Sequence, residues 1–253
     1  MEDTWACTLC TFLNPSITSM CQMCGSPNTS PTESPSSTLP VSLGPPLVSE
    51  GALLVRQMED DNSCCFAAIS YCMYGNRSYA SDLRETIAGA AGSDPNTWNA
   101  ATLGKPVGEY QAWIRKPTSW GGGIELALMA SHFQVEIAVM DAQTTRMDLF
   151  GTGSGYDSRI YVLYTGIHYD ALAWAPSQSA PESGDTRIFS PLDTRVEDAA
   201  VALVAGVNAQ HGFTDTASFA LFCQDCGTIL RGQTAAVEHA KATAHSAFVE
   251  YKE

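Results

Sequence analysis

Cysteines and histidines that can bind metal gather near the two ends of this chain, and the long middle section has few of them. The first cluster joins two Cys-x2-Cys turns and consists of Cys7, Cys10, Cys21 and Cys24. The second joins one Cys-x2-Cys turn to two histidines and consists of Cys223, Cys226, His239 and His245. Thiolate and imidazole ligands at such spacings suit a tetrahedral zinc ion. The chain is therefore expected to fold as a larger domain between two small zinc modules.

Disulfide bonds are the alternative for a chain with nine cysteines. The sequence begins with the acidic Met1-Glu2-Asp3, and no apolar segment typical of a secretory leader follows. We therefore interpret both clusters as reduced thiols on two structural zinc ions, in a protein of the cytoplasm or nucleus. Both sets look fully ligated and no His-Glu-x-x-His motif is present, so no cofactor is expected to take part in catalysis.

Length and charge exclude several classes of function. The chain has 253 residues, 45% of them hydrophobic, which suffices for one ordinary domain with small attachments. No apolar run reaches the roughly 20 residues that a membrane-spanning helix needs. The formal net charge is -14, from 27 acidic against 13 basic residues. Because such a surface repels phosphate groups, nucleic acids and anionic membranes are not expected partners.

Changes in composition place the expected domain boundaries. The N-terminal zinc module is expected at 1–27, and a flexible linker rich in Ser, Thr and Pro at 28–50. A domain of mixed helices and strands is expected at 51–175. A second polar linker is expected at 176–195, followed by a helix and the two-Cys two-His module at 196–253.

Hydrophobic periodicity predicts the elements of the central domain. Helices are predicted over 66–74, 82–90 and 124–133, and a further one over 196–207. Strands are predicted over 135–140, 146–150 and 160–164. The first and last of these strands are almost continuously apolar, which is typical of strands covered on both faces. The central domain is therefore predicted to be α/β.

Cys64 stands apart from the zinc clusters and lies at the start of the first predicted helix, where a helix N-terminus favours the thiolate. His168 follows the last predicted strand, and the carboxylate of Asp170 comes two residues later. A thiol, a histidine base and an orienting acid are the groups that nucleophilic sulfur catalysis needs. Backbone amides of the turn from Asp61 to Cys64 are candidates for an oxyanion hole.

At these positions the chain resembles the ovarian-tumour (OTU) family of deubiquitinating cysteine proteases. The motifs that carry the resemblance are Asp61-Asn62-Ser63-Cys64, Trp120-Gly121-Gly122 with Glu125, and Gly166-Ile167-His168-Tyr169-Asp170. The resemblance implies an α+β papain-like fold that hydrolyses isopeptide bonds between ubiquitin and lysine. It implies that Cys64 is the nucleophile, that His168 is the general base and that Asp61 and Asp170 are both candidate orienting acids. It also implies that Ile167 contacts the substrate.

Within this family the chain is most similar to the YOD-type subgroup, in which a two-Cys two-His finger ends the chain. Cys65 departs from the family pattern, which usually has leucine there and implies a side chain directed into the core. In the subgroup a ubiquitin-like module docks the AAA unfoldase Cdc48, and here a zinc module stands in its place. A Cdc48-type ATPase is therefore a candidate partner without its usual docking module.

The N-terminal module resembles the Ran-binding-protein type of zinc finger. It has no Lys or Arg, unlike the RNA-binding branch of those fingers, and its Thr11, Phe12 and Met23 match the ubiquitin-binding branch, called NZF. The resemblance implies that these three residues contact ubiquitin. The alternative is that Phe12 and Met23 merely cap a very small core, but so small a module cannot hide all its apolar side chains.

The helix of the C-terminal module presents small and acidic side chains where DNA-reading fingers have Arg, Asn or Gln. We therefore interpret that module as structural or protein-binding. Two classes of function remain for the whole chain: an enzyme that cleaves polyubiquitin, and a ubiquitin-binding adaptor whose thiol site is catalytically weak. The presence of Cys64, His168 and Asp170 together favours the enzyme.

Overall fold

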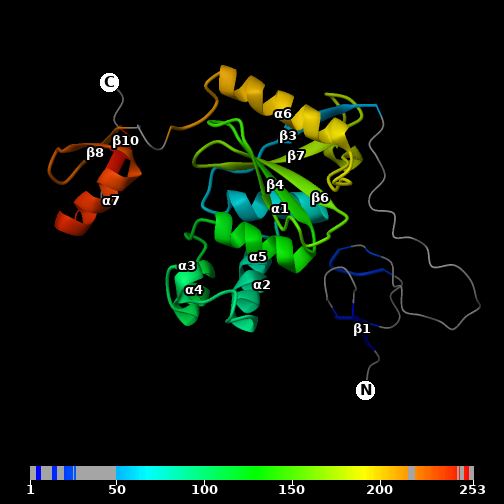
Figure 1. Cartoon of the computed structure of the whole chain (residues 1–253), viewed down its shortest axis with the longest axis horizontal. Helices are drawn as coiled ribbons and strands as arrows, with labels where there is room; N and C mark the ends of the chain where they lie inside the picture. The colour runs from blue at the N-terminus through cyan, green and yellow to red at the C-terminus, as the bar shows by residue number, and fades with distance from the viewer. Residues whose placement is uncertain are drawn as a thin grey trace, which may run out of the picture.

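The computed structural model describes residues 4–6, 13–15, 20–24, 26, 50–215, 220–243, 245 and 248–250. Most of them form one domain around a five-stranded sheet, and the others belong to the two terminal modules (Figure 1). Within these ranges, the helices are either too short or too polar to cross a membrane.

The central sheet mixes parallel and antiparallel strand pairs. Its members are β3 (Ala52–Arg56), β4 (Glu136–Asp141), β5 (Met147–Phe150), β6 (Arg159–Tyr164) and β7 (Tyr169–Ala175). They lie in the order β3-β7-β6-β4-β5, with β4 and β6 parallel and the other neighbours antiparallel. The short connection from β6 to β7 carries His168, so this residue is fixed between two paired strands.

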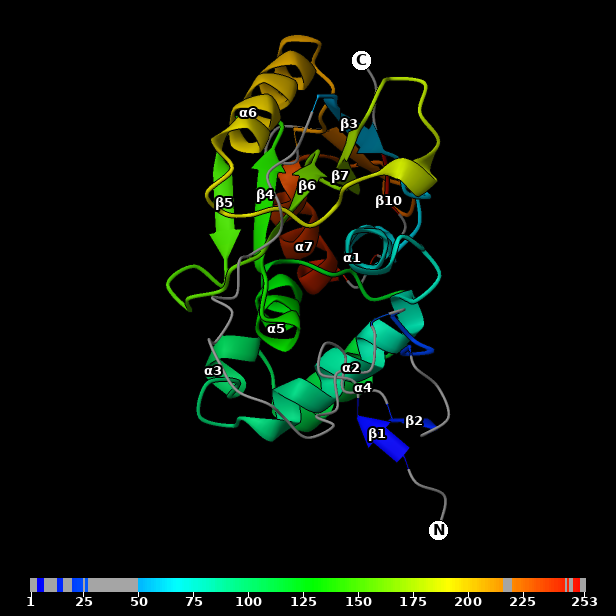
Figure 2. The same ribbon diagram turned by 90° about the vertical axis from the view of Figure 1, so that its right-hand side faces the viewer.

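Helices cover one face of the sheet and extend the domain away from it (Figures 1 and 2). They are α1 (Cys64–Tyr74), α2 (Ala80–Ser93), α3 (Ala100–Leu103), α4 (Val107–Ile114) and α5 (Gly123–Phe133). Helix α1 lies against β6 and β7, and eight of its eleven residues are buried. It packs on alternate sheet residues, among them Ile160 and Val162 of β6. An apolar sequence without a polar face is thus the expected sequence for a helix surrounded by protein.

Helix α6 (Thr194–Ala209) covers the opposite face of the sheet (Figures 1 and 2). Its buried residues Val196, Ala200 and Val204 recur every four positions, and they pack against sheet residues that include Ala138 and Tyr161. The neighbouring residues of the same strands point to the α1 face. The prediction that β4 and β6 are covered on both faces is therefore confirmed, and so is the α/β class of the domain.

Residues 176–195, predicted to be a polar linker, are instead part of the central domain. Phe189 is fully buried against Tyr161 and pairs with Arg159 in an isolated β-bridge. Asp185 accepts two hydrogen bonds of 2.7 Å from Arg56 and one of 2.5 Å from the Tyr71 hydroxyl. The short helix η1 (Glu182–Gly184) lies in the same segment. The prediction is wrong because the polar side chains bond to the domain, and a single aromatic ring fills a core position.

The same packing corrects the last predicted boundary, since α6 belongs with the central domain and not with the C-terminal module. The described strands of the N-terminal module, β1 (Thr4–Ala6) and β2 (Leu13–Pro15), form an antiparallel pair. The C-terminal module contains β8 (Ala220–Cys223), β9 (Ile229–Arg231), α7 (Gly232–Thr243) and β10 (Phe248–Glu250). Its strands lie in the antiparallel order β10-β8-β9.

Candidate active site

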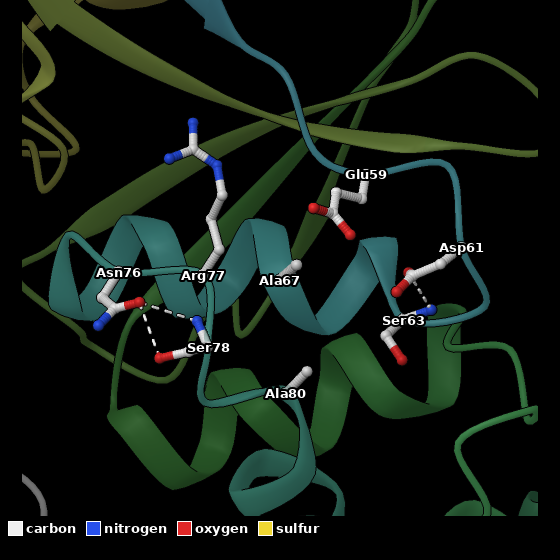
Figure 3. A pocket seen from close by; sticks show the side chains of 8 residues that line it. All are labelled: Glu59, Asp61, Ser63, Ala67, Asn76, Arg77, Ser78 and Ala80. Atoms are coloured by element: carbon white, nitrogen blue, oxygen red, sulfur yellow. Dashed lines mark hydrogen bonds between the residues drawn. The ribbon is translucent and has the colours of Figure 1, made fainter.

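The Cys loop, residues 57–63, joins β3 to α1 and ends at the predicted nucleophile. A carboxylate oxygen of Asp61 accepts a hydrogen bond of 2.7 Å from the backbone N–H of Ser63 (Figure 3). This turn leads directly into α1, whose first residue is Cys64. A short polar turn followed by an apolar helix therefore places the thiol at a helix N-terminus, as predicted.

The thiol of Cys64 is largely buried, because only 7% of the residue is exposed. Burial raises the pKa of Cys64, and the backbone N–H groups of Tyr169 and Cys65 partly oppose that shift by donating to the sulfur. The negative charges of Asp61 and Asp170 raise the pKa further. The helix N-terminus therefore does not by itself keep this sulfur ionised, and a base must take its proton.

The neighbouring thiol of Cys65 belongs to the core. It is 2% exposed, and burial raises the pKa of Cys65 well above the ordinary thiol value. A Cβ atom added to Gly121 would lie 3.0 Å from the Cys65 sulfur, so the chain before α5 passes very close to this side chain. The prediction that Cys65 points into the core is confirmed, and such a thiol stays neutral and unreactive.

The His loop, residues 165–168, closes tightly between β6 and β7. The backbone N–H of Thr165 donates to the carbonyl oxygen of His168 at 3.0 Å. Gly166 has φ of 98°, a conformation that side-chain-bearing residues rarely adopt. The hydroxyl of Tyr164 donates a hydrogen bond to the Gly166 carbonyl. The loop thus needs glycine at this position to present His168 next to the start of β7.

The imidazole of His168 is held from one side by Asp170. Its Nε2 lies 3.1 Å from Oδ1 of Asp170, and this same oxygen accepts the backbone N–H of Met58 at 2.7 Å. The other ring nitrogen, Nδ1, is buried, has no hydrogen-bond partner in the part of the chain that is described, and lies 3.9 Å from Oδ1 of Asp60. Asp170 therefore favours the tautomer with its proton on Nε2, which leaves Nδ1 able to accept a proton.

Of the two acids predicted to orient His168, the structure brings Asp170 to the imidazole and not Asp61. The ion pairs found for His168 among the described residues involve Asp60 and Asp170. Asp61 instead holds the Ser63 amide and faces a separate pocket of about 300 Å³ that lies beside α1 (Figure 3). Its position suits a role in shaping the Cys loop.

A pocket of about 230 Å³ opens onto Cys64. Its lining residues are Asn62, Cys64, Trp120, Gly121, Gly122, Gly123, Tyr164, Ile167 and Tyr169. The run of three glycines leaves one wall without side chains, so the space suits an extended peptide that itself has no side chains. The indole N–H of Trp120 donates to the Asn62 side chain at 2.6 Å and joins this wall to the Cys loop. Ile167 is 42% exposed beside the pocket, where the family resemblance places substrate.

A second pocket, of about 360 Å³, lies on the His168 side of Ile167. Its lining residues are Gln57, Met58, Asp60, Thr165, Ile167, His168, Asp170 and Thr214. Ile167 lines both pockets, whereas Cys64 lines only the first and His168 only the second. The site therefore offers a narrow glycine-walled side at the sulfur and a more polar side at the imidazole.

Arg84 of α2 braces the Cys loop and was not found from the sequence. It is 3% exposed and its guanidinium donates to the carbonyl oxygens of Asn62 and Ile114, both at 3.0 Å. The same group lies over the ring of Phe66, with 4.1 Å between the guanidinium carbon and the ring centroid. The sequence did contain one signal for this role. Arg84 lies on the buried face of α2, where the other side chains are apolar.

The C-terminal cluster has the geometry of a zinc site. The ligand atoms of Cys223, Cys226, His239 and His245 all lie within 4.8 Å of one another. The Cys223 sulfur lies 3.6 Å from Nδ1 of His245, and the Cys226 sulfur 3.4 Å from Nε2 of His239. Zinc bonds of ~2.1 to ~2.3 Å in a tetrahedron separate neighbouring ligands by about 3.6 Å, so these residues fit a zinc ion. The hydrogen bonds of Thr228 lower the pKa of Cys226 to about 6, in keeping with a thiolate ligand.

Only part of the N-terminal cluster lies within the described residues. Cys21 is 2% exposed, and its sulfur accepts a hydrogen bond of 3.4 Å from the buried side chain of Asn14. Cys24 and Met23 are half-buried beside it. Cys7, Cys10, Thr11 and Phe12 lie outside the described residues, so the predicted ligand set and ubiquitin-contact set of this module stay predictions.

Two family models match the chain at the regions just described. Residues 59–172 match the OTU-like cysteine protease model. Residues 217–251 match the model described as the C-terminal C2H2-type zinc finger of ubiquitin thioesterase OTU1. The first match contains residues 59–63 of the Cys loop and the whole His loop, and the second contains all four residues of the C-terminal cluster.

Known proteins resemble the chain over most of its length. The ovarian tumor domain-containing deubiquitinating enzyme 2 of Arabidopsis thaliana is 44% identical over 207 residues, which cover 80% of this chain and 100% of that protein. Ubiquitin thioesterase OTU1 of Dictyostelium discoideum is 41% identical over 78% of this chain and 61% of that protein. The human protein of the same name is 39% identical over 75% of this chain and 55% of its own length. The chain thus spans the whole plant relative but little more than half of the other two.

A solved structure supports the same assignment. An OTU domain in complex with ubiquitin superposes with a TM-score of 0.57 and 32% identity, covering 64% of this chain and 90% of that chain. The likeness in fold, the two matching family models and the plant relative agree with the geometry around Cys64 and His168. The chain therefore belongs to the OTU family of cysteine-type deubiquitinating enzymes.

Proposed function

We propose that this protein hydrolyses the isopeptide bond between the C-terminal glycine of ubiquitin and a lysine side chain within polyubiquitin. The observation that carries this proposal is that Cys64 and His168 line adjoining pockets that share Ile167, and that Nδ1 of His168 is buried and unbonded while its Nε2 contacts Asp170. A catalytic base must have one nitrogen fixed and the other available, and this arrangement meets both conditions.

In the proposed reaction, the Cys64 sulfur attacks the glycine carbonyl carbon while its proton passes to Nδ1 of His168. The tetrahedral intermediate then collapses, the C–N bond breaks, and the imidazolium gives its proton to the departing lysine amine. Water, deprotonated by His168, attacks the thioester carbon and releases free ubiquitin and the Cys64 thiol. A neutral resting thiol, which the burial of Cys64 favours, suits this proton transfer at the moment of attack.

Two amides of the Cys loop are candidates to stabilise the oxyanion. The N–H of Asp61 donates to Glu59 O at 2.9 Å and that of Ser63 donates to Asp61 at 2.7 Å, so both are engaged. The amides of Asn62 and Cys64 have no such loop partner among the described contacts, and Cys64 begins a helix whose first N–H groups point outward. We propose that these two amides bind the developing negative charge.

The glycine wall supports the proposed substrate. The space between Gly121–Gly123 and Ile167 suits a tail without side chains, and ubiquitin ends in two glycines. The polar pocket at His168 then receives the lysine side, so that the imidazole meets the leaving amine. Ile167 contacts the tail at the junction of the two pockets.

The terminal modules support substrate capture in this proposal. The N-terminal module binds a structural zinc through Cys7, Cys10, Cys21 and Cys24 and contacts ubiquitin through Thr11, Phe12 and Met23. Together with the C-terminal site this gives two zinc ions per chain, and neither takes part in catalysis. We place the protein in the cytoplasm or nucleus, and we keep a Cdc48-type ATPase as a candidate partner.

The deciding experiment incubates the purified full chain with di-ubiquitins of every linkage, beside a Cys64→Ala control. We expect cleavage of at least one linkage by the wild type and of none by the control. Equal cleavage by both proteins would refute the thiol mechanism. Binding of ubiquitin without any cleavage would favour the adaptor instead.

A further inference from the structure

The segment that follows α6, residues 211–215, runs against the His loop although it lies far along the chain. The backbone N–H of Thr214 donates to the carbonyl oxygen of Thr165 at 2.7 Å. A Cβ atom at Gly166 would overlap the carbonyl oxygen of Thr214, so the absence of a side chain there allows the approach. Thr214 also lines the pocket that holds His168 and Asp170. The two segments are thus joined through their backbones beside the catalytic imidazole.

The segment is itself anchored on both sides of Thr214. Before it, the Asn208 side chain at the end of α6 donates to the carbonyls of Ala142 and Gln143, at 2.7 and 2.9 Å. After it, Asp215 accepts a hydrogen bond of 2.9 Å from the Gln143 side chain. Phe213 adds apolar contacts with the core on the α6 face. Thr214 is therefore a fixed point, because the residues around it are attached to the end of β4.

The other described hydrogen bonds of the His-loop backbone come from the loop itself and from the Tyr164 hydroxyl next to it. The loop's own closing bond joins Thr165 to His168, and its Gly166 adopts a conformation in which glycine loses much freedom on folding. A loop held in a sparsely populated conformation persists only where its surroundings determine it. The contact from Thr214 restrains the residue pair Thr165–Gly166, which sets where the backbone turns toward His168.

We propose that Thr214 is a positioning residue that holds the His loop, and with it His168, in the reactive geometry. The functional unit then extends beyond residues 59–172, which match the protease family model, as far as Asp215. This inference rests on the proposed role of His168 as the base. It assigns the connection before the C-terminal module a task in catalysis that does not depend on zinc.

The contact is made by the backbone of Thr214. Two substitutions at this position can therefore distinguish the effect of the backbone hydrogen bond from the effect of the side chain. Thr214→Pro removes the N–H that bonds Thr165, whereas Thr214→Ala keeps both backbone groups and removes only the hydroxyl and methyl. Each full-length variant is assayed with ubiquitin that carries a fluorogenic amine at its C-terminus. We expect Thr214→Pro to lower kcat by on the order of tenfold with a smaller change in KM, because the base is misplaced while the glycine wall of the tail pocket is untouched.

Thr214→Ala is expected to retain most of the kcat that Thr214→Pro loses. Equal kcat for wild type and Thr214→Pro, or an equal loss in both variants, would overturn the proposal. Thermal melting shows whether the proline protein is folded at the assay temperature. If it is not, the double variant Asn208→Ala/Gln143→Ala decides instead, because it removes three hydrogen bonds that anchor this segment to the end of β4 without touching the His loop. A lowered kcat supports the proposal and an unchanged kcat overturns it. Failure of the wild type to release the amine would refute the proposed function itself.

Discussion

The two halves of the active site are built in different ways. The Cys loop and the start of α1 rely on neighbours in sequence, since the Asp61 carboxylate binds the Ser63 amide and an apolar helix begins at once. The His loop relies on distant residues, since His168 is held by Asp170 of β7 and the loop backbone is held by Thr214. A nucleophile can therefore be placed by a short motif, whereas a base in this fold is placed by strand pairing and long-range contacts.

The largest effect expected from this comparison concerns the two adjacent thiols. Cys64→Ser should reduce cleavage of di-ubiquitin by on the order of 10⁴-fold or more, because serine at this site is a far weaker nucleophile. Cys65→Ala should retain most of the activity and lose on the order of 1 kcal/mol of unfolding free energy from the buried volume. Steady-state kinetics and urea unfolding measure the two quantities. An electrophilic ubiquitin probe that labels Cys65 would reverse the assignment.

The next effect compares the two candidate acids. Asp170→Asn keeps an oxygen for the Met58 amide but loses the charge beside His168, and we expect kcat to fall on the order of 10²-fold. Asp61→Asn retains an acceptor for the Ser63 amide, and we expect a loss below about tenfold because no ion pair to His168 is broken. Both variants are assayed with the same fluorogenic substrate across pH. A larger loss in Asp61→Asn would mean that the Cys loop supplies the orienting acid.

The same difference between local and long-range contacts separates the residues that were found from the sequence from those that were missed. Cys64 was placed correctly because a turn, a thiol and an apolar helix follow one another in the chain, and β4 and β6 were found because their apolar runs are continuous. Arg84 was missed and the contact of Thr214 with the His loop was not predicted, because what these residues bond is decided by tertiary packing.

Phe189 and β7 show the same limit in another form. Phe189 lies in a mostly polar stretch with only Ile188 and Leu192 as apolar neighbours nearby, and no periodicity marks it as core. The sequence of β7 was interpreted only as a motif that carries Asp170, and no strand was predicted there. The strand lies between β3 and β6 in the sheet, and six of its seven residues are buried. Composition describes stretches of chain, so it misses a core position filled by one side chain.

A smaller effect, on the unfolding free energy, is expected when the Cys loop loses its hydrogen bonds from Arg84. Arg84→Met leaves the carbonyls of Asn62 and Ile114 without their charged donor, and we expect it to lower the unfolding free energy by about 2 kcal/mol. The matched control is Arg115→Met, whose ion pair with Glu85 is exposed to solvent and should contribute little to the unfolding free energy. Urea unfolding monitored by tryptophan fluorescence compares the two. Similar values would show that the Cys loop is self-sufficient and needs no brace from α2.

The smallest effect on the chemistry is expected from zinc removal. A strong chelator should release two zinc ions per chain and unfold the terminal modules, because such modules take their folding free energy from the metal. Turnover of the fluorogenic ubiquitin substrate should change less than about twofold, since both halves of the site lie within the domain that ends before the C-terminal cluster. A colorimetric zinc indicator measures release during the assay. Activity lost in proportion to zinc would show that the His half depends on the finger as well.

Asp170 links the two halves through a single oxygen, which receives the Met58 amide from the Cys loop and faces the His168 ring. This shared oxygen ties the position of the Cys loop to that of the His168 ring within the free protein. The tail of the substrate is then expected to enter a pocket that is already formed. The enzyme would therefore lose little conformational entropy on binding. We expect such a site to discriminate by the thickness of the incoming chain, so that a tail with one extra methyl group is rejected by steric exclusion instead of by weaker attraction.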